Sequence, residues 1–221
     1  MGMGVDIRNQ MAKRAAEEIQ NGMVVNLGIG IPSLVPNHLS QKIQVMFHAE
    51  NGIMGMGPSP IKGNEDENLC NAGGFPVTLT NGGSYCDSSI AFGMIRSGRV
   101  DITILGSLQV SQDGDLANWI VPGKKVPGMG GAMELAQKAK KVIVVMNHCD
   151  KHGHPKIVNR CTLPLTSSRC VDVIITELAV FKITETGLIL TELFAPYKLD
   201  IVEGKTGCEF KVSEMIRNIP Y

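Results

Sequence analysis

Residues 23–32 read MVVNLGIGIP, an apolar run that passes through two glycines into a proline. The apolar run over residues 23–27 has the length of a buried strand. Pro32 suits the first turn of a helix, which we expect to continue to about Leu39. A strand that leads through a glycine-rich break into a helix opens a β-α-β unit, so this stretch predicts an α/β fold with parallel strands.

The same alternation continues on both sides of this stretch. Before it, apolar residues recur every four positions over residues 7–19 and predict a helix that ends at Gly22. Ser88 or Ser89 is the expected N-cap of a later helix. The expected strands are 43–47, 100–105, 116–121 and 142–146, and the further expected helices are 88–96 and 130–140.

The last third of the chain follows a different pattern. Strand-like runs at residues 171–176, 179–183 and 188–193 follow one another without helices, and Thr186-Gly187 is a plausible hairpin turn. We therefore expect one domain over residues 1–221, with an open, mainly parallel sheet flanked by helices and a more antiparallel C-terminal part.

Composition excludes several classes of protein. The 221 residues carry 21 basic and 21 acidic side chains, and this balance leaves no basic footprint for nucleic acid. Hydrophobic residues make up 43%, too many for a disordered chain, and no apolar run approaches the roughly 18 residues that span a membrane. The six cysteines are scattered without a C-x-x-C pair, which predicts reduced thiols in a cytoplasmic protein.

Three glycine-rich loops follow expected strands, at residues 26–32, 50–58 and 122–131. In an open parallel sheet, ligands bind beyond the carboxyl ends of the strands, where such loops lie. The first loop resembles a dinucleotide fingerprint, but Ser33 takes the place of its third glycine. We therefore interpret this loop as a tight turn and not as a nicotinamide site.

Glu50 comes directly after a strand-like run and before Gly52, Gly55 and Gly57. Its carboxylate is expected to point into the cleft above the sheet, although a solvated loop glutamate is the common alternative. In the third loop, Gly128, Gly130 and Gly131 precede a helix, where free backbone N–H groups can stabilise a developing oxyanion. A purely structural role, in which these three glycines let the helix pack closely against the sheet, explains the glycine pattern equally well.

The segment HCDKHGH at residues 148–154 has the composition of a metal site. Its ligand spacings are too tight for the usual zinc patterns, and no second pair of ligands lies nearby in sequence. We therefore expect a polar loop there and no metal site.

Four segments of this sequence resemble the family I coenzyme A transferases, and more narrowly the B-type (beta) subunit of 3-oxoacid, acetoacetate/butyrate and acetate CoA-transferases. These are ENGIMGMGP at 50–58, NLGIGIP at 26–32, LANWIVPGK at 116–124 and GMGGAM at 128–133. CTLPLT at 161–166 and TELAVF at 176–181 fit the same family, and the resemblance runs from about Ala12 to Val212.

The resemblance implies that Glu50 is the nucleophile of a ping-pong CoA transfer between short-chain acids such as acetoacetate, acetate, butyrate or succinate. It implies that the amide of Gly131 donates to the oxyanion and that Asn26 and Asn118 line the acyl pocket. Coenzyme A is then a substrate, with no permanently bound cofactor. The remaining residues expected to bind substrate or CoA are Gly28, Gly30, Asn51, Lys124, Gly128 and Gly130.

Two positions depart from the pattern of the family. Ala49 replaces the serine before the nucleophile, and Gly74 stands where the fused mitochondrial enzymes have a lysine. The second departure favours the bacterial branch with two separate subunits, so we expect an alpha-subunit partner, commonly in a heterotetramer. A ligand-sensing α/β domain that binds a small phosphorylated metabolite is the alternative function, and a nucleotide-dependent oxidoreductase is a weaker third.

Overall fold

A ten-stranded sheet, in the order β13-β12-β11-β10-β8-β5-β1-β2-β3-β4, organises the computed structural model, which describes residues 4–40, 42–123, 126 and 128–220. Its strands are β1 (Val24–Leu27), β2 (Met46–Ala49), β3 (Ile53–Met56), β4 (Leu79–Tyr85), β5 (Ile102–Leu105), β8 (Lys141–Val145), β10 (Val173–Ile175), β11 (Ala179–Thr184), β12 (Gly187–Phe194) and β13 (Lys211–Ile219). A second sheet has three strands, β7 (Leu116–Ala117), β6 (Gln109–Ser111) and β9 (Ile157–Val158).

The large sheet is parallel at its centre. Strands β2, β1, β5, β8 and β10 pair in parallel, and β10, β11 and β12 then pair antiparallel. This confirms the predicted fold class. Two features were not predicted: β3 and β4 add antiparallel strands at the other edge, and β13 returns parallel to β12.

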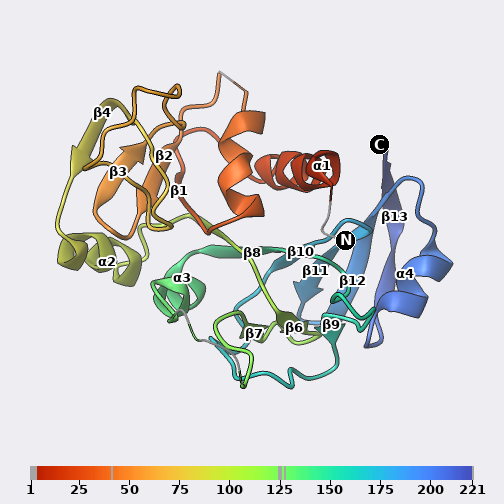
Figure 1. Ribbon diagram of the computed structural model, residues 1–221. Helices are drawn as coiled ribbons and strands as arrows, with labels where there is room; N and C mark the ends of the chain where they lie inside the picture. Colours follow the sequence, from red (N-terminus) through yellow and green to blue (C-terminus); the bar gives the residue numbers. More distant parts are fainter. Residues whose placement is uncertain (1–3, 41, 124–125, 127, 221) are drawn as a thin grey trace.

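Helices cover both faces of the central strands (Figure 1). The helices are α1 (Val5–Ala16), α2 (Ser88–Arg96), α3 (Ala132–Lys138), α4 (Leu199–Lys205) and the 3-10 helix η1 (Ile31–His38). Successive side chains of a strand point to opposite faces, and β1 shows the result. Val25 packs in the core beneath α1, whereas Val24 packs against the cluster formed by α2 and α3. None of the described helices combines the length and apolar character needed to cross a membrane.

Several predicted boundaries were wrong for local reasons. The helix expected from Pro32 is the 3-10 helix η1, which contains Pro36, a residue without the N–H that an α-helical ladder needs. Asp87 caps α2 in place of either serine, because its Oδ1 accepts from the backbone N–H of Ile90 at 3.0 Å. The strand expected over residues 116–121 is limited to β7 and belongs to the smaller sheet.

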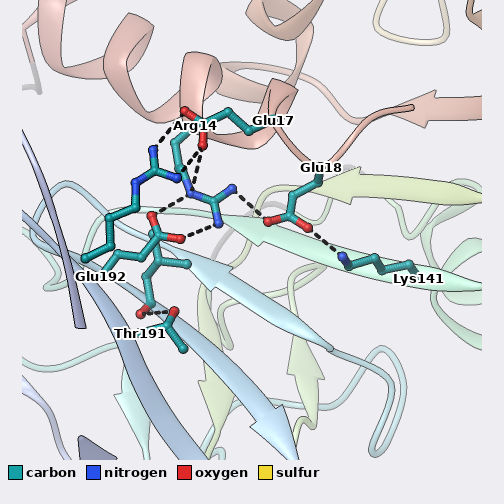
Figure 2. A network of polar contacts seen from close by, with 8 residues as sticks. Arg14, Glu17, Glu18, Lys141, Thr191 and Glu192 are labelled. Carbon is teal, nitrogen blue, oxygen red and sulfur yellow. Dashed lines mark hydrogen bonds and ion pairs between the residues drawn. The ribbon is translucent and has the colours of Figure 1, made fainter. Parts of the chain in front are cut away.

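A network of ion pairs ties α1 to the sheet (Figure 2). The guanidinium of the buried Arg14 donates to both carboxylate oxygens of Glu192 on β12, at 2.7 and 2.6 Å, and to Glu18 at 2.7 Å. Glu18 in turn accepts from Lys141 on β8, at 2.5 Å. Arg217 of β13 pairs with Glu17 nearer the surface. The network therefore fixes the helix that covers the central strands.

Candidate active site

The turn between β2 and β3 presents Glu50, the first residue after β2. The N–H of Gly52 donates to the carbonyl of Ala49 at 3.0 Å and closes this turn. Gly52 has φ +113°, and a Cβ at this position would lie 2.1 Å from the carbonyl oxygen of Cys86. Only glycine fits both the backbone angle and the space, so it holds the turn against the segment that leads into α2.

The loop expected over residues 50–58 is therefore only partly a loop. Residues Ile53–Met56 form β3, which pairs antiparallel with β2, so Glu50 lies at the tip of a hairpin. The position of its carboxylate follows from strand alternation. Val25 and Phe47 face the core under α1, so Asn26 and His48, paired in register on β1 and β2, face the other way. Glu50, two residues after His48, lies on that same side.

Asn26 contacts the carboxylate of Glu50 directly. The side-chain nitrogen Nδ2 of Asn26 donates to Oε2 of Glu50 at 3.0 Å, and the Asn26 side chain is buried. The same nitrogen also donates to the backbone carbonyl of His48 at 3.1 Å. A half-buried carboxylate with a fixed hydrogen-bond donor is held in one orientation toward the cleft.

Gly131 lies against the other side of the Glu50 side chain. A Cβ at Gly131 would be 3.0 Å from Cγ of Glu50 and 3.3 Å from both Cδ and Oε1. Gly131 is the N-cap of α3, with φ −78°, an angle that any residue can adopt. Glycine is favoured at this position because a larger side chain would crowd Glu50. The end of the third glycine-rich loop therefore lies beside the hairpin tip.

These residues line one cavity of about 840 Å³, within the usual range for a small-molecule site. Glu50 is the acidic group among its described lining residues, and Arg8 of α1 is the cationic one. The cavity brings together eight of the predicted site residues: Asn26, Gly28, Gly30, Glu50, Asn118, Gly128, Gly130 and Gly131.

Asn51 and Lys124 are the two predicted site residues that are not among these eight. Asn51 does not line the cavity, and its side-chain nitrogen donates to the carbonyl of Cys70 at 2.8 Å. Asn51 is turned away because it follows Glu50 in the hairpin tip, where successive side chains diverge. Lys124 lies outside the described residues.

Asn118 is held rigidly at the cavity wall. Its Nδ2 donates to the carbonyl of Gly106 at 3.1 Å, and its Oδ1 accepts from the hydroxyl of Thr166 at 2.7 Å. Its backbone N–H donates to the same hydroxyl oxygen at 3.1 Å. Two hydrogen bonds fix the amide plane and the third fixes the backbone, so any ligand meets a preformed surface at this residue.

Sequence reasoning missed part of the lining. Arg8 and the segment at residues 71–73 with Phe75 line the cavity, although no expected strand end or glycine loop pointed to Arg8. Gly73, beside the family departure at Gly74, packs against Ile29, because a Cβ there would lie 2.9 Å from Cγ1 of Ile29. Arg8 is the positively charged residue among the described residues that line the cavity.

Side chains of the histidine-rich segment at residues 148–154 form hydrogen bonds within the protein. The ring nitrogens of the buried His148 contact the hydroxyls of Thr176 and Thr206, both at 3.0 Å, and burial lowers the pKa of His148 to about 4. Asp150 accepts from the backbone N–H groups of His152 and His154. Over the described residues, no group of three or more His, Cys, Asp or Glu side chains is placed to hold a metal ion.

The sequence profile of the Coenzyme A transferase family matches residues 8–195, which is most of the chain. The chain belongs to the coenzyme A transferase family. It is 63% identical over 212 residues to the beta subunit of a probable coenzyme A transferase of Bacillus subtilis, covering 96% of this chain and 98% of that protein. It is also 48% identical to the B-type subunit of the succinyl-CoA:3-ketoacid coenzyme A transferase of Helicobacter pylori, covering 93% and 99% of the two chains.

Longer relatives match this transferase chain over part of their length. The human mitochondrial succinyl-CoA:3-ketoacid coenzyme A transferase 2 is 49% identical over 218 residues, which are 98% of this chain but 42% of that protein. Among solved structures, the acyl-CoA transferase YdiF of Escherichia coli O157:H7 has a TM-score of 0.75 at 21% identity, covering 99% of this chain and 44% of its own. Glutaconate coenzyme A-transferase of Acidaminococcus fermentans has a TM-score of 0.71 at 17% identity, covering 96% and 88%. Both structures support the fold, and the family assignment disfavours the ligand-sensing and oxidoreductase alternatives.

Proposed function

We propose that this chain is the beta subunit of a CoA-transferase and supplies its nucleophile, Glu50. The observation that carries the proposal is the position of the Glu50 carboxylate in the cavity, between the donor Nδ2 of Asn26 and the backbone of Gly131. A carboxylate nucleophile divides acyl exchange into easier steps and conserves the energy of the thioester. Relatives that match over their full length are named as CoA-transferase subunits, which supports the same reaction.

The reaction begins when an oxygen of the Glu50 carboxylate attacks the thioester carbonyl of an acyl-CoA. A C–O bond forms, the C–S bond breaks, and CoA leaves as a thiolate, so the products are an acyl-glutamyl anhydride and the thiolate. The thiolate then attacks Cδ of Glu50, where a C–S bond forms and the anhydride C–O bond breaks. The first carboxylate is released, and a glutamyl-CoA thioester remains.

The second half of the reaction repeats these steps in reverse with another carboxylate. The incoming acid attacks Cδ of the glutamyl thioester and expels the CoA thiolate, which then attacks the acyl carbonyl of the new anhydride. The new acyl-CoA leaves and the Glu50 carboxylate is regenerated. No proton is gained or lost over the cycle, so the site needs donors for developing oxyanions and not a general base.

We assign that task to Asn26 and Gly131. Each attack at Cδ of Glu50 turns its carbonyl oxygen into an oxyanion, and Nδ2 of Asn26 already donates to one oxygen of this group at 3.0 Å. We assign the backbone N–H of Gly131 as a second donor, because Gly131 lies directly beside the same carboxylate. The absence of a side chain at Gly131 also leaves room for the sulfur of CoA beside Cδ.

Substrates and partners follow from the named relatives as part of the proposal. Several relatives are named for succinyl-CoA and 3-ketoacids, so we propose exchange between succinyl-CoA and a short-chain 3-oxoacid such as acetoacetate. Acetate and butyrate are further candidate acids. The mitochondrial relatives are more than twice as long as the matched region, so we propose that a separate alpha subunit supplies the remainder. A heterotetramer and a cytoplasmic location stay predictions from the sequence.

Arg8 adds a positive charge to the cavity, where the anionic groups of CoA or of a dicarboxylic acid would bind. It forms no ion pair with the other described residues. Coenzyme A enters the proposal as a substrate, and we propose no permanently bound cofactor.

The proposal is tested by steady-state exchange kinetics of the chain co-expressed with an alpha subunit. Glu50→Gln keeps the size and polarity of the side chain but removes the nucleophile, so exchange is expected to fall by roughly 10³-fold or more. Glu185→Gln, in the exposed turn between β11 and β12, is the matched control and should exchange at the wild-type rate. Full exchange activity in the Glu50→Gln enzyme would disprove the proposed role.

A further inference from the structure

His48 is buried directly behind the pair formed by Asn26 and Glu50. It lies on β2, is 1% exposed, and faces α2. Its Nε2 is 3.1 Å from the backbone carbonyl of Ala91 in α2, and its Nδ1 is 3.3 Å from Nδ2 of Asn26. The ring thus forms a bridge from a helix to the amide that contacts the carboxylate of Glu50.

The two partners of the ring decide where its proton lies. The carbonyl oxygen of Ala91 can only accept, so Nε2 of His48 must carry a hydrogen. Nδ2 of Asn26 can only donate, so Nδ1 of His48 must present a lone pair. The hydrogen bonds therefore specify the neutral tautomer with hydrogen on Nε2.

The hydrogen atoms of the Asn26 amide are then fully assigned. One N–H points to Oε2 of Glu50 at 3.0 Å. The other is shared between two acceptors of His48, its backbone carbonyl at 3.1 Å and its Nδ1 at 3.3 Å. The amide oxygen faces Thr103 of β5, whose hydroxyl is 3.5 Å away. An amide rotated by half a turn would place its oxygen against Oε2 of Glu50 and against both acceptors of His48.

We propose that His48 is a positioning residue for CoA transfer, which holds the Asn26 amide with its N–H toward Glu50. This inference rests on the proposed function, because it assigns the task of Asn26 in stabilising the oxyanion on Glu50. His48 itself does not touch the reacting atoms. Its contribution is the acceptor at Nδ1, which makes one orientation of Asn26 better than the other before the substrate arrives.

The surroundings of His48 favour the neutral ring. Burial lowers its pKa, and the hydrogen bond to the carbonyl of Ala91 and the carboxylate of Glu50 oppose part of this effect. From β1 and α2 the ring contacts Asn26 and the carbonyl of Ala91, neither of which is titratable. Glu50 is therefore the charged group that faces it within the described residues. A protonated ring would turn an N–H toward the N–H of Asn26 and abolish the orienting contact.

The kinetics of His48 variants distinguish a positioning role of the ring from a role in packing alone. His48→Leu removes the acceptor, and kcat is expected to fall roughly 10- to 100-fold while KM for acyl-CoA changes less than about twofold. His48→Asn places an amide oxygen near the position of Nδ1, so it should recover most of that loss. His148→Leu is the control, because His148 is equally buried but does not line the cavity. It should lower stability while kcat is unchanged.

The thermal unfolding of every variant is recorded first, and each is then assayed as an enzyme assembled with its alpha subunit. The inference fails if folded His48→Leu enzyme keeps the wild-type kcat, or if His48→Asn is no better than His48→Leu. The ring ¹⁵N spectrum of the wild-type enzyme gives a second test that needs no stable apolar variant. It should show His48 as the neutral tautomer with hydrogen on Nε2 near pH 7, and a charged ring or hydrogen on Nδ1 would overturn the inference.

Formation of a CoA adduct by the wild-type enzyme distinguishes failure of the His48 inference from failure of the proposed function. If it forms a covalent CoA adduct on Glu50 and His48→Leu forms that adduct at the same rate, the role of His48 alone is wrong. If the wild-type enzyme exchanges CoA without any adduct on Glu50, the nucleophile is wrong, and the positioning role falls with it.

Discussion

Gly131 and Glu50 lie side by side in the wall of the cavity, so closely that a single added methyl group at Gly131 would lie 3.0 Å from Cγ of Glu50. The two residues are 81 positions apart in the chain and come from the start of α3 and from the β2–β3 hairpin. Their proximity places the N-cap of α3 directly beside the carboxylate.

Gly131→Ala is therefore expected to displace the Glu50 carboxylate without straining its own backbone, since φ is −78°. A shift of this kind in a reacting group lowers kcat/KM by about 100-fold. Gly93→Ala, in α2 with open space around the added methyl, is the matched control and should be active. Exchange kinetics of the two enzymes check the prediction, and equal rates would show that Glu50 does not need this space.

Gly52→Ala is expected to destabilise the fold itself. The new methyl group would meet the carbonyl oxygen of Cys86 at 2.1 Å, and φ at this position is +113°. Gly22→Ala, at φ +83° with nothing nearby, adds only the backbone strain of about 1 kcal/mol. Urea unfolding should show a loss of more than about 3 kcal/mol for Gly52→Ala. Similar losses in the two variants would mean that the turn relaxes away from Cys86.

Arg14→Met should be strongly destabilising because it leaves the carboxylate of Glu192 buried without its partner. Breaking a buried pair in this way costs about 3–5 kcal/mol, whereas Arg14→Met with Glu192→Met should recover a large part of the loss. The exposed pair of Arg217 and Glu17 offers a comparison, and Arg217→Met should cost less than about 1 kcal/mol. Chemical denaturation measures all three variants, and a double variant no more stable than Arg14→Met alone would refute the coupling.

Stability should fall as the pH drops from about 6.5 to 4, in part because of His148. Burial lowers the pKa of this ring from its ordinary 6.5 to about 4, with the charge of Lys205 adding to the effect. Between these pH values the unfolded chain binds a proton at His148 that the folded chain does not. The contribution of His148 to the free energy of unfolding is therefore complete above pH 6.5 and is lost toward pH 4. The loss is on the order of 2–3 kcal/mol.

His148→Gln keeps hydrogen-bonding capacity at the same position but does not titrate. Denaturation of both proteins between pH 4 and 7 should therefore show a shallower dependence on pH for His148→Gln. Parallel curves would mean that other groups, such as His48, account for the acid sensitivity.

The central strands and Glu50 could be predicted from the sequence because their signals are local. Strands β1, β5 and β8 are short apolar runs buried on both faces, and Glu50 follows its strand directly. The hairpin strand β3 was missed because it contains Gly55 among residues expected to form a loop. The edge strand β13 was missed because most of its side chains are exposed and leave no apolar pattern.

The contacts between distant segments could not be predicted in the same way. Arg14 and Glu192 are 178 residues apart, and nothing in their neighbourhoods marks them as partners. Arg8 reaches the cavity only because α1 packs beside η1 over β1. Asn51 was expected at the site from the resemblance to the family, but the tip of a hairpin directs its side chain away from that of Glu50. These features require the folded chain.

The central claim is that Glu50 forms a thioester with CoA, and mass spectrometry of the loaded enzyme tests it most directly. The chain assembled with its alpha subunit is incubated with succinyl-CoA or acetoacetyl-CoA without an acceptor acid, then treated with borohydride or left untreated, and digested. We predict CoA attached to the peptide that contains Glu50, its conversion to the side-chain alcohol by borohydride, and neither product in Glu50→Gln enzyme. An enzyme that exchanges CoA while this peptide stays unmodified, or that carries CoA on another residue, would contradict the account.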